Sequence, residues 1–144
     1  MSIAIITAPS GRVDQPAGLP REVVSQLVER AAQAGRTVAV RACSSATEIA
    51  DCLRQSSGNG TEFVLFDPGV HSLSRSEIGA CISRLGTPCI EVHAGTGGPV
   101  EIATVADALS VIDGYGAQGY VLGLSIALEY LGDAECENAI HVGT

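Results

Sequence analysis

Residues 37–66, TVAVRACSSATEIADCLRQSSGNGTEFVLF, decide the fold because they contain a complete unit of strand, helix and strand. The runs at 37–41 and 62–66, rich in β-branched and apolar residues, are typical of buried strands. Between them, Ser45 and Glu48 form the S-x-x-E pattern of a capped helix start, and Gly58 suits the helix end. Two strands joined through a helix predict parallel pairing with a right-handed crossover.

The same alternation of strand and helix patterns extends over the rest of the chain. Further strands are expected at 3–7, at 88–92 and, from a weaker pattern, at 110–113. Helical periodicity is found from Pro20 to Gly35, after the capping pattern Ser74-x-x-Glu77, at 102–109 and at 114–132, where a buried helix is expected. We therefore expect one α/β domain over residues 1–144, a doubly wound fold with a five-stranded parallel sheet. In such folds ligands bind beyond the carboxyl ends of the strands.

The composition limits the kinds of partner that the protein can have. The net charge is −8, which argues against nucleic acid and anionic membranes, since both require basic patches. No apolar stretch approaches the ~20 residues of a membrane helix, and residues 1–10 lack the features of a signal peptide. The odd number of cysteines, five, fits reduced thiols. We expect a cytoplasmic protein whose partner is a small molecule or further copies of itself.

Several kinds of cofactor chemistry are disfavoured by the sequence. The chain contains no lysine, which excludes Schiff-base catalysis, lysine-anchored pyridoxal phosphate and the Walker lysine. The cysteines form no C-x-x-C pair, so a zinc or redox motif is not indicated. A G-x-G-x-x-G pattern occurs at Gly114, Gly116 and Gly119, but it follows the last expected strand rather than the first. We expect neither a metal nor an organic cofactor.

Residues 88–95, PCIEVHAG, place two ionisable side chains at the end of an expected buried strand. Because side chains alternate between the faces of a strand, Glu91 and His93 should point the same way at its carboxyl end. A histidine can donate or accept a proton near neutral pH, and a neighbouring carboxylate can fix its tautomer, which suits a general acid. We interpret the two as a candidate acid–base pair. The alternative is a buried imidazole that is satisfied by a backbone carbonyl.

Two further ionisable residues follow the strand at 62–66. Asp67 comes directly after it, and His71 lies four residues later in the same loop. Both would then join Glu91 and His93 around one crevice, and either is a candidate base, although a loop histidine can be merely solvated. His141, near the end of the sequence, is interpreted as incidental or as a contact between subunits.

Two segments resemble the type II 3-dehydroquinate dehydratases, which are small flavodoxin-like enzymes of the shikimate pathway. Residues 66–95, FDPGVHSLSRSEIGACISRLGTPCIEVHAG, are similar to that family's Asn-Pro-Gly-Ala loop, its helix and its strand ending Glu-Val-His. Residues 111–131, VIDGYGAQGYVLGLSIALEYL, are similar to its closing Gly-x-Gly-x-x-Gly-Tyr helix. The resemblance runs over nearly the whole chain and implies a lyase with a flavodoxin-like fold.

The resemblance also implies roles for individual residues. Family members eliminate water from a cyclic hydroxy-ketone through an enolate, and their strand histidine protonates the departing hydroxyl group. By this likeness His93 is the general acid and Glu91 is its companion. The implied substrate-binding residues come from three loops: Ser10, Arg12, Pro68, Gly69, Ala94 and Gly95. Trimers assembled into dodecamers, with the active site near subunit contacts, are implied as well.

The chain departs from the family pattern at the residues that handle an anionic substrate. The family's base is a tyrosine of the lid loop, aided by an arginine, but residues 8–20 contain no tyrosine and Arg12 is the one possible counterpart of that arginine. Asp67 replaces the asparagine of the third loop, and residues 94–108 contain no arginine. We therefore expect a divergent lyase of specialised metabolism that dehydrates, cyclises or isomerises a less anionic hydroxy-ketone, cyclic or polyketide-like. The alternatives are an authentic 3-dehydroquinate dehydratase and a non-catalytic binding or assembly module.

Overall fold

The computed structural model describes the parts of the chain that form the sheet and three helices. These parts are residues 2–7, 19–43, 46–56, 60–67, 80–81, 84, 86–93 and 109–143, with the backbone alone at 46, 113 and 133–143. Of the helix expected after Ser74, residues 80, 81 and 84 are described and are helical, whereas the helix expected at 102–109 lies almost wholly outside this set.

Five strands form one parallel sheet in the order β2-β1-β3-β4-β5. The bounds are β1 Ser2–Thr7, β2 Thr37–Ala42, β3 Thr61–Phe66, β4 Cys89–His93 and β5 Ser110–Asp113. Each expected strand is found, with its ends displaced by at most one residue. This strand order is the flavodoxin-like variant of the doubly wound fold, so the predicted fold class is confirmed.

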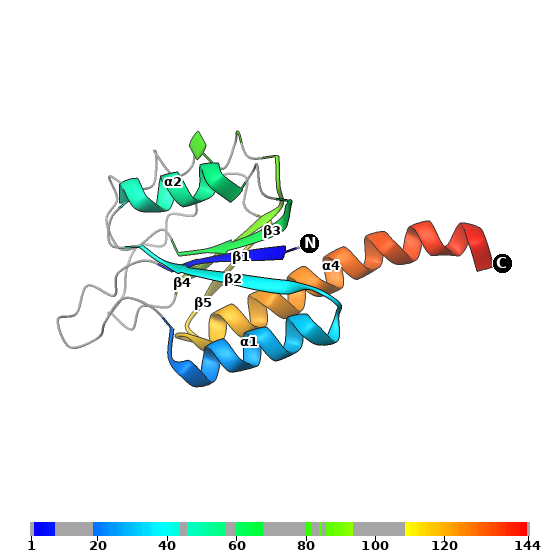
Figure 1. Ribbon diagram of the computed structural model, residues 1–144, viewed down its shortest axis with the longest axis horizontal. Helices are drawn as coiled ribbons and strands as arrows, with labels where there is room; N and C mark the ends of the chain where they lie inside the picture. The colour runs from blue at the N-terminus through cyan, green and yellow to red at the C-terminus, as the bar shows by residue number, and fades with distance from the viewer. Residues whose placement is uncertain are drawn as a thin grey trace.

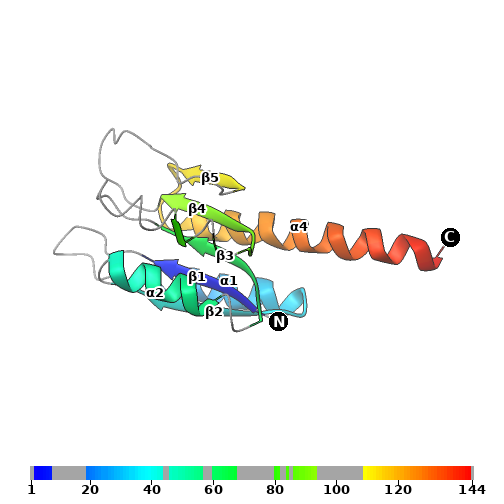
Figure 2. The same cartoon turned by 90° about the horizontal axis from the view of Figure 1, so that it is seen from above.

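Among the described residues, three continuous helices cover the two faces of the sheet, as Figures 1 and 2 show. Helices α1 (Arg21–Gln33) and α4 (Gln118–Gly143) lie side by side on one face, and α2 (Ala46–Ser56) lies on the other. Pro20 immediately precedes α1, and Gly35 follows it with a φ of 72°, a conformation that glycine adopts without steric cost. Within the described parts of the chain, no helix is long and apolar enough to cross a membrane.

The prediction of a buried last helix needs correction. One side of α4 packs on the sheet, but Leu122 and Ile126 are more than two-fifths exposed on the other side. Tyr130 is exposed to a similar degree, although its ring contacts that of Phe63 on the sheet. The helix also continues well past residue 132 and extends beyond the sheet in Figure 1. Hydrophobic periodicity does not predict this exposed side, because α4 is apolar on most of its surface and the sequence alone does not indicate which side faces the sheet.

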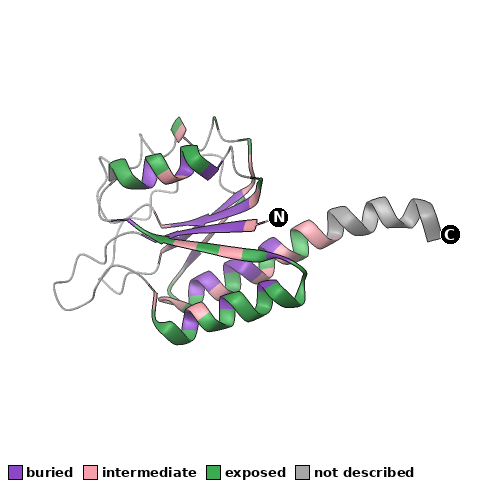
Figure 3. Cartoon of the chain, in the orientation of Figure 1, coloured by how far each residue is buried: buried purple, intermediate pink, exposed green. Residues whose placement is uncertain are grey.

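The sheet separates two apolar layers, whose buried residues are coloured in Figure 3. The layer under α1 and α4 contains Ile3, Ile5, Val23, Leu27, Phe63, Leu65, Ile90, Val92, Ile112, Tyr120, Leu124 and Ala127. The layer under α2 contains Ala4, Ile6, Cys43, Ile49, Leu53, Val64, Phe66 and Cys89. Successive residues of β1, β3 and β4 alternate between these layers, as the period of a strand requires.

Glycines let α4 approach the sheet closely. A Cβ atom at Gly119 would lie 2.9 Å from Val92 Cγ1, and one at Gly123 would lie 3.2 Å from Leu65 Cδ2. Gly114 and Gly116 have φ values of 88° and 57° and form the turn that leads into the helix. The G-x-G-x-x-G pattern is therefore accounted for by turn geometry and by helix–sheet packing.

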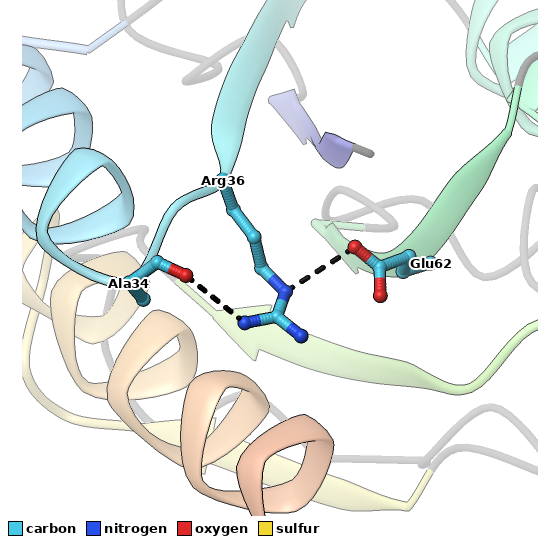
Figure 4. A network of polar contacts seen from close by, with 3 residues as sticks. All are labelled: Ala34, Arg36 and Glu62. Atoms are coloured by element: carbon cyan, nitrogen blue, oxygen red, sulfur yellow. Dashed lines mark hydrogen bonds and ion pairs between the residues drawn. The ribbon is translucent and has the colours of Figure 1, made fainter. Parts of the chain in front are cut away.

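An ion pair between a buried arginine and a partly buried glutamate lies at the amino-terminal end of the sheet, as Figure 4 shows. Arg36, just before β2, donates from Nε to Oε1 of Glu62 on β3 over 3.2 Å. Its Nη1 group donates to the carbonyl of Ala34 after α1 over 3.3 Å. One side chain thus holds the end of α1 and the starts of β2 and β3 together.

Candidate active site

The register of the sheet brings the predicted acid–base residues to one edge. On β4, Glu91 pairs with Phe66 of β3 and with Val111 of β5. Asp67 directly follows Phe66, and His93 pairs with the last residue of β5. These residues therefore lie at the carboxyl ends of neighbouring strands, where ligands bind in doubly wound folds.

Glu91 and His93 form a direct hydrogen bond. His93 Nε2 lies 2.8 Å from Glu91 Oε1, within the short range of charge-assisted hydrogen bonds. Ile90 and Val92, which alternate with them along β4, pack in the layer under α1 and α4. The pair therefore lies on the α2 face, as the alternation along the strand predicted for the two side chains.

Burial differs sharply between the two members of this pair. The Glu91 side chain is completely buried, whereas 15% of the His93 side chain is exposed. The buried Glu91 carboxylate thus orients the imidazole from the protein interior. The partly exposed His93 is the member of the pair that a small molecule can contact. Because Nε2 is bonded to Glu91, Nδ1 is the ring nitrogen available for proton transfer. A partner of this kind differs from the backbone carbonyl expected for a purely structural histidine.

Asp67 lies at the same edge but belongs to the other side of the sheet. Its backbone N–H donates to the carbonyl of Ile6 over 3.0 Å, so it continues the ladder between β3 and β1. The alternation that places Leu65 under α1 and α4 directs Asp67 toward the same layer. Its charge acts on Tyr120, a residue of that layer. The described structure therefore joins Glu91 with His93 and places Asp67 near Tyr120.

Tyr120 was not singled out as a site residue from the sequence. It lies in the first turn of α4, and its hydroxyl group is buried without a hydrogen-bond partner among the described residues. Burial raises the pKa of Tyr120 well above its usual value, and the charge of Asp67 raises it further. The phenol stays protonated, which makes it a donor rather than a base. The feature of the sequence that could have identified Tyr120 is its position one residue after Gly119, at the end of the helix that lies next to the strand termini.

The remaining predicted site residues lie in loops outside the described residues. They are Ser10, Arg12, Pro68, Gly69, His71, Ala94 and Gly95. A cavity of about 80 Å³ is found elsewhere, between β1, β2 and α2. Ser2, Arg41 and Cys52 are among the residues that line it, and neither Glu91 nor His93 does.

Comparisons with known proteins agree with this architecture. A family model described as dehydroquinase class II matches residues 19–128. A 3-dehydroquinate dehydratase of Pseudomonas savastanoi pv. phaseolicola is 30% identical over 115 residues, which cover 76% of this chain and 77% of that relative.

Solved structures show the same likeness. A type II dehydroquinase from Propionibacterium acnes superposes with a TM-score of 0.72 at 25% identity, covering 89% of this chain and 98% of the other. A type II dehydroquinase from Butyrivibrio crossotus gives a TM-score of 0.73 at 19% identity, covering 88% and 97%.

Proposed function

This chain belongs to the class II dehydroquinase family, and from that premise we propose that it eliminates water from a small cyclic or polyketide-like hydroxy-ketone. The family expected from the sequence and the enzyme class, a lyase, are both confirmed by the match over residues 19–128. The identity of the substrate is our proposal, as are the roles of individual residues.

The hydrogen bond between Glu91 and His93 is the observation that carries this proposal. Elimination of water requires a proton to be taken from carbon and another to be delivered to the departing hydroxyl group. His93, partly exposed and held by a buried carboxylate over 2.8 Å, is suited to deliver that second proton. Glu91 fixes the orientation of the imidazole and stabilises the charge that it carries before the transfer.

We assign the first proton transfer to Asp67 or His71, because no tyrosine occurs in the lid segment at residues 8–20. Asp67 follows β3 at the edge where His93 lies, but on the opposite side of the sheet, so it would have to reach the substrate across the strand ends. Asp67 also carries a negative charge at the position where type II dehydroquinases have an asparagine, whose neutral amide helps to stabilise an enolate. A substrate whose carbonyl oxygen develops less negative charge during the reaction would be repelled less by Asp67.

The arginine content of the loops favours a substrate with less negative charge. Residues 94–108 contain no arginine that would bind a substrate carboxylate, and the first loop offers Arg12 alone. Each charge-assisted hydrogen bond that is missing removes roughly 1.5–3 kcal/mol of binding free energy. We therefore propose an uncharged, more apolar hydroxy-ketone of specialised metabolism.

The second candidate substrate is 3-dehydroquinate itself. It is favoured by the 30% identical relative from Pseudomonas savastanoi pv. phaseolicola, which is a 3-dehydroquinate dehydratase. It requires that Arg12 and residues outside the described parts of the chain bind a carboxylate.

Absorbance of the conjugated enone product distinguishes the candidates. Purified protein is assayed with 3-dehydroquinate and with an uncharged cyclic β-hydroxy-ketone, and we expect faster turnover of the uncharged ketone. His93→Ala should lower kcat by about 10²–10⁴-fold, since that is the usual contribution of a general acid. His141→Ala is the matched histidine control, with circular dichroism as a check of folding.

Three outcomes would count against the proposal. Faster turnover of 3-dehydroquinate would replace it with the second candidate. Unchanged turnover in His93→Ala would remove the acid–base pair from the reaction. Absence of turnover with every hydroxy-ketone would support a non-catalytic binding module.

We further propose that the protein assembles as trimers or dodecamers. The apolar side chains of Leu122, Ile126 and Tyr130 are exposed on α4 in the single chain and would gain burial at a subunit contact. Light scattering gives the mass of the assembly, and a monomer in dilute solution would contradict the proposal.

A further inference from the structure

Cysteines gather on one face of the sheet. All four cysteines whose side chains the structure describes, Cys43, Cys52, Cys81 and Cys89, belong to the layer under α2. Within this layer, the Sγ atoms of Cys43 and Cys52 lie 3.4 Å apart. The two residues are nine positions apart in the chain, and they meet because one follows β2 and the other lies in α2.

We propose that Cys43 and Cys52 are an oxidisable dithiol, a modification site that closes to an intrachain disulfide by exchange with a small-molecule disulfide such as glutathione disulfide. A disulfide bond is about 2.05 Å long, so the two sulfur atoms must approach by a little over 1 Å. Both residues are attached to secondary structure at the same level of the sheet. The N–H of Cys43 donates to the carbonyl of Thr7 over 2.8 Å, and Cys52 lies within α2.

The two thiols are accessible to different degrees, which sets the order of the reaction. Only 1% of Cys43 is exposed, and burial is the main cause that raises its pKa to about 12. Cys52 is partly exposed and lines the cavity of about 80 Å³ between the sheet and α2. Arg41 and Gln55, which are joined by a hydrogen bond of 2.9 Å, line the same cavity. Cys52 is therefore the thiol that an incoming reagent reaches first.

The exchange balances in two steps. The Cys52 thiolate attacks one sulfur of the small disulfide, forming a mixed disulfide and releasing one small thiolate. Cys43 then loses its proton and its sulfur attacks Cys52 Sγ, which forms the internal bond and releases the second small thiolate. Two protein thiols are oxidised by two electrons, and the small disulfide is reduced to two thiols that take up the two protons.

Closure of this bond would attach α2 covalently to the end of β2. The end of β2 pairs with the end of β1, because Ala42 is in register with Thr7. Oxidation would therefore fix the position of α2 relative to the strand edge from which the first loop departs. A cysteine spacing of nine residues matches no redox motif, so this pair is visible in three dimensions alone.

Peptide mass spectrometry tests the proposal directly. Trypsin cleaves after Arg41 and Arg54, so both cysteines lie in one peptide, ACSSATEIADCLR, over residues 42–54. The native protein is equilibrated with mixtures of reduced and oxidised glutathione, quenched in acid, alkylated and digested. We expect this peptide to lose the mass of two hydrogen atoms and to escape alkylation as the buffer becomes more oxidising.

Single variants test the order of the two steps. Cys43→Ser should leave glutathione attached to Cys52, and Cys52→Ser should leave Cys43 as a free thiol. Cys81→Ser, in the same layer, is the matched control and should leave the oxidation of the peptide unchanged. A wild-type peptide that stays doubly alkylated in buffers that oxidise a reference dithiol would overturn the proposal. Loss of its oxidation in Cys81→Ser would also overturn it. Circular dichroism checks that each variant is folded, and the wild-type measurement does not depend on the variants.

Discussion

The two ends of the sheet each contain a carboxylate paired with a basic side chain, and they differ in the base: Glu62 is partly buried and Glu91 is fully buried. At the amino-terminal end Glu62 pairs with Arg36 over 3.2 Å, and at the carboxyl end Glu91 pairs with His93 over 2.8 Å. An arginine stays charged at every accessible pH, whereas a histidine changes its protonation near neutrality. Similar geometry therefore produces a permanent connection at one end and a pair able to transfer a proton at the other.

The carboxyl end also holds two groups that retain their protons unusually strongly. Burial raises the pKa of Cys43 to about 12 and that of Tyr120 well above its usual value. Cys43 follows β2, and Tyr120 lies in the turn of α4 nearest the strand ends. Because the folded state holds both protons more tightly than the unfolded state does, we infer that alkaline pH lowers the stability of the fold through this end of the sheet.

Among the variants that compare the two ends of the sheet, the largest effect is expected from Glu91→Gln. The amide keeps the shape of the side chain but loses the charge that stabilises a protonated His93, so we expect kcat to fall about 100-fold. This corresponds to about 2.7 kcal/mol of activation free energy. Steady-state kinetics with the best hydroxy-ketone substrate measures it. Equal losses in Glu91→Gln and Glu62→Gln would show that the two ends do not differ in role.

The next largest effect is expected from Gly119→Ala, where α4 touches the carboxyl half of β4. The added methyl group would lie 2.9 Å from Val92 Cγ1, so we expect a loss of about 1–3 kcal/mol in the free energy of unfolding. Val92 lies between Glu91 and His93, and kcat should fall as well.

Gly132→Ala is the matched control on the same helix, measured with Gly119→Ala by urea denaturation. A Cβ atom there meets nothing within 4 Å, so helix propensity should raise stability by up to about 1 kcal/mol. If Gly119→Ala left the free energy of unfolding unchanged, α4 would be able to move away from the sheet without loss of stability.

A smaller effect on stability, and none on turnover, is expected from Glu62→Gln. Arg36 would keep the Ala34 carbonyl among its partners but lose the charged one, which should cost about 1.5–2 kcal/mol of unfolding free energy. Thermal and urea unfolding measure the loss, and unchanged kcat is the control. A drop in kcat at temperatures where the variant is folded would contradict the assignment of a structural role to this end.

The smallest effect, taken over a single pH unit, is a change of stability with alkaline pH. Because the folded state holds the Cys43 proton more tightly than the ordinary pKa of 9, the contribution of this thiol is complete below pH 9. It is lost as pH rises toward about 12, with a slope of up to about 1.4 kcal/mol per pH unit. Unfolding by urea at several alkaline pH values measures the slope, and Cys43→Ala should flatten it. An unchanged slope in that variant would assign the alkaline loss to other groups, Tyr120 first.

The strands and the acid–base pair could be predicted because both depend on local patterns. Runs of β-branched residues predict all five strands, and the alternation along 88–93 predicts that Glu91 and His93 point the same way, as their hydrogen bond confirms. Hydrophobic periodicity and side-chain direction act over a few residues, so a sequence records them directly.

Features that depend on packing between distant segments could not be predicted in this way. The contact between Cys43 and Cys52 depends on how α2 lies on the sheet, and the close approach at Gly119 depends on the path of α4. Tyr120 acquires its raised pKa from burial and from Asp67, which is far away in the chain. The exposed side of α4 was missed for the same reason, since an apolar helix does not indicate which side has a partner.

The position of α4 has a consequence for biosynthesis. It covers β3, β4 and β5 and contacts α1, yet the ribosome makes it after all of them. A nascent chain that has not reached residue 118 carries β4 with its Val92 face uncovered. We expect such a chain to need protection from aggregation until translation has passed this helix.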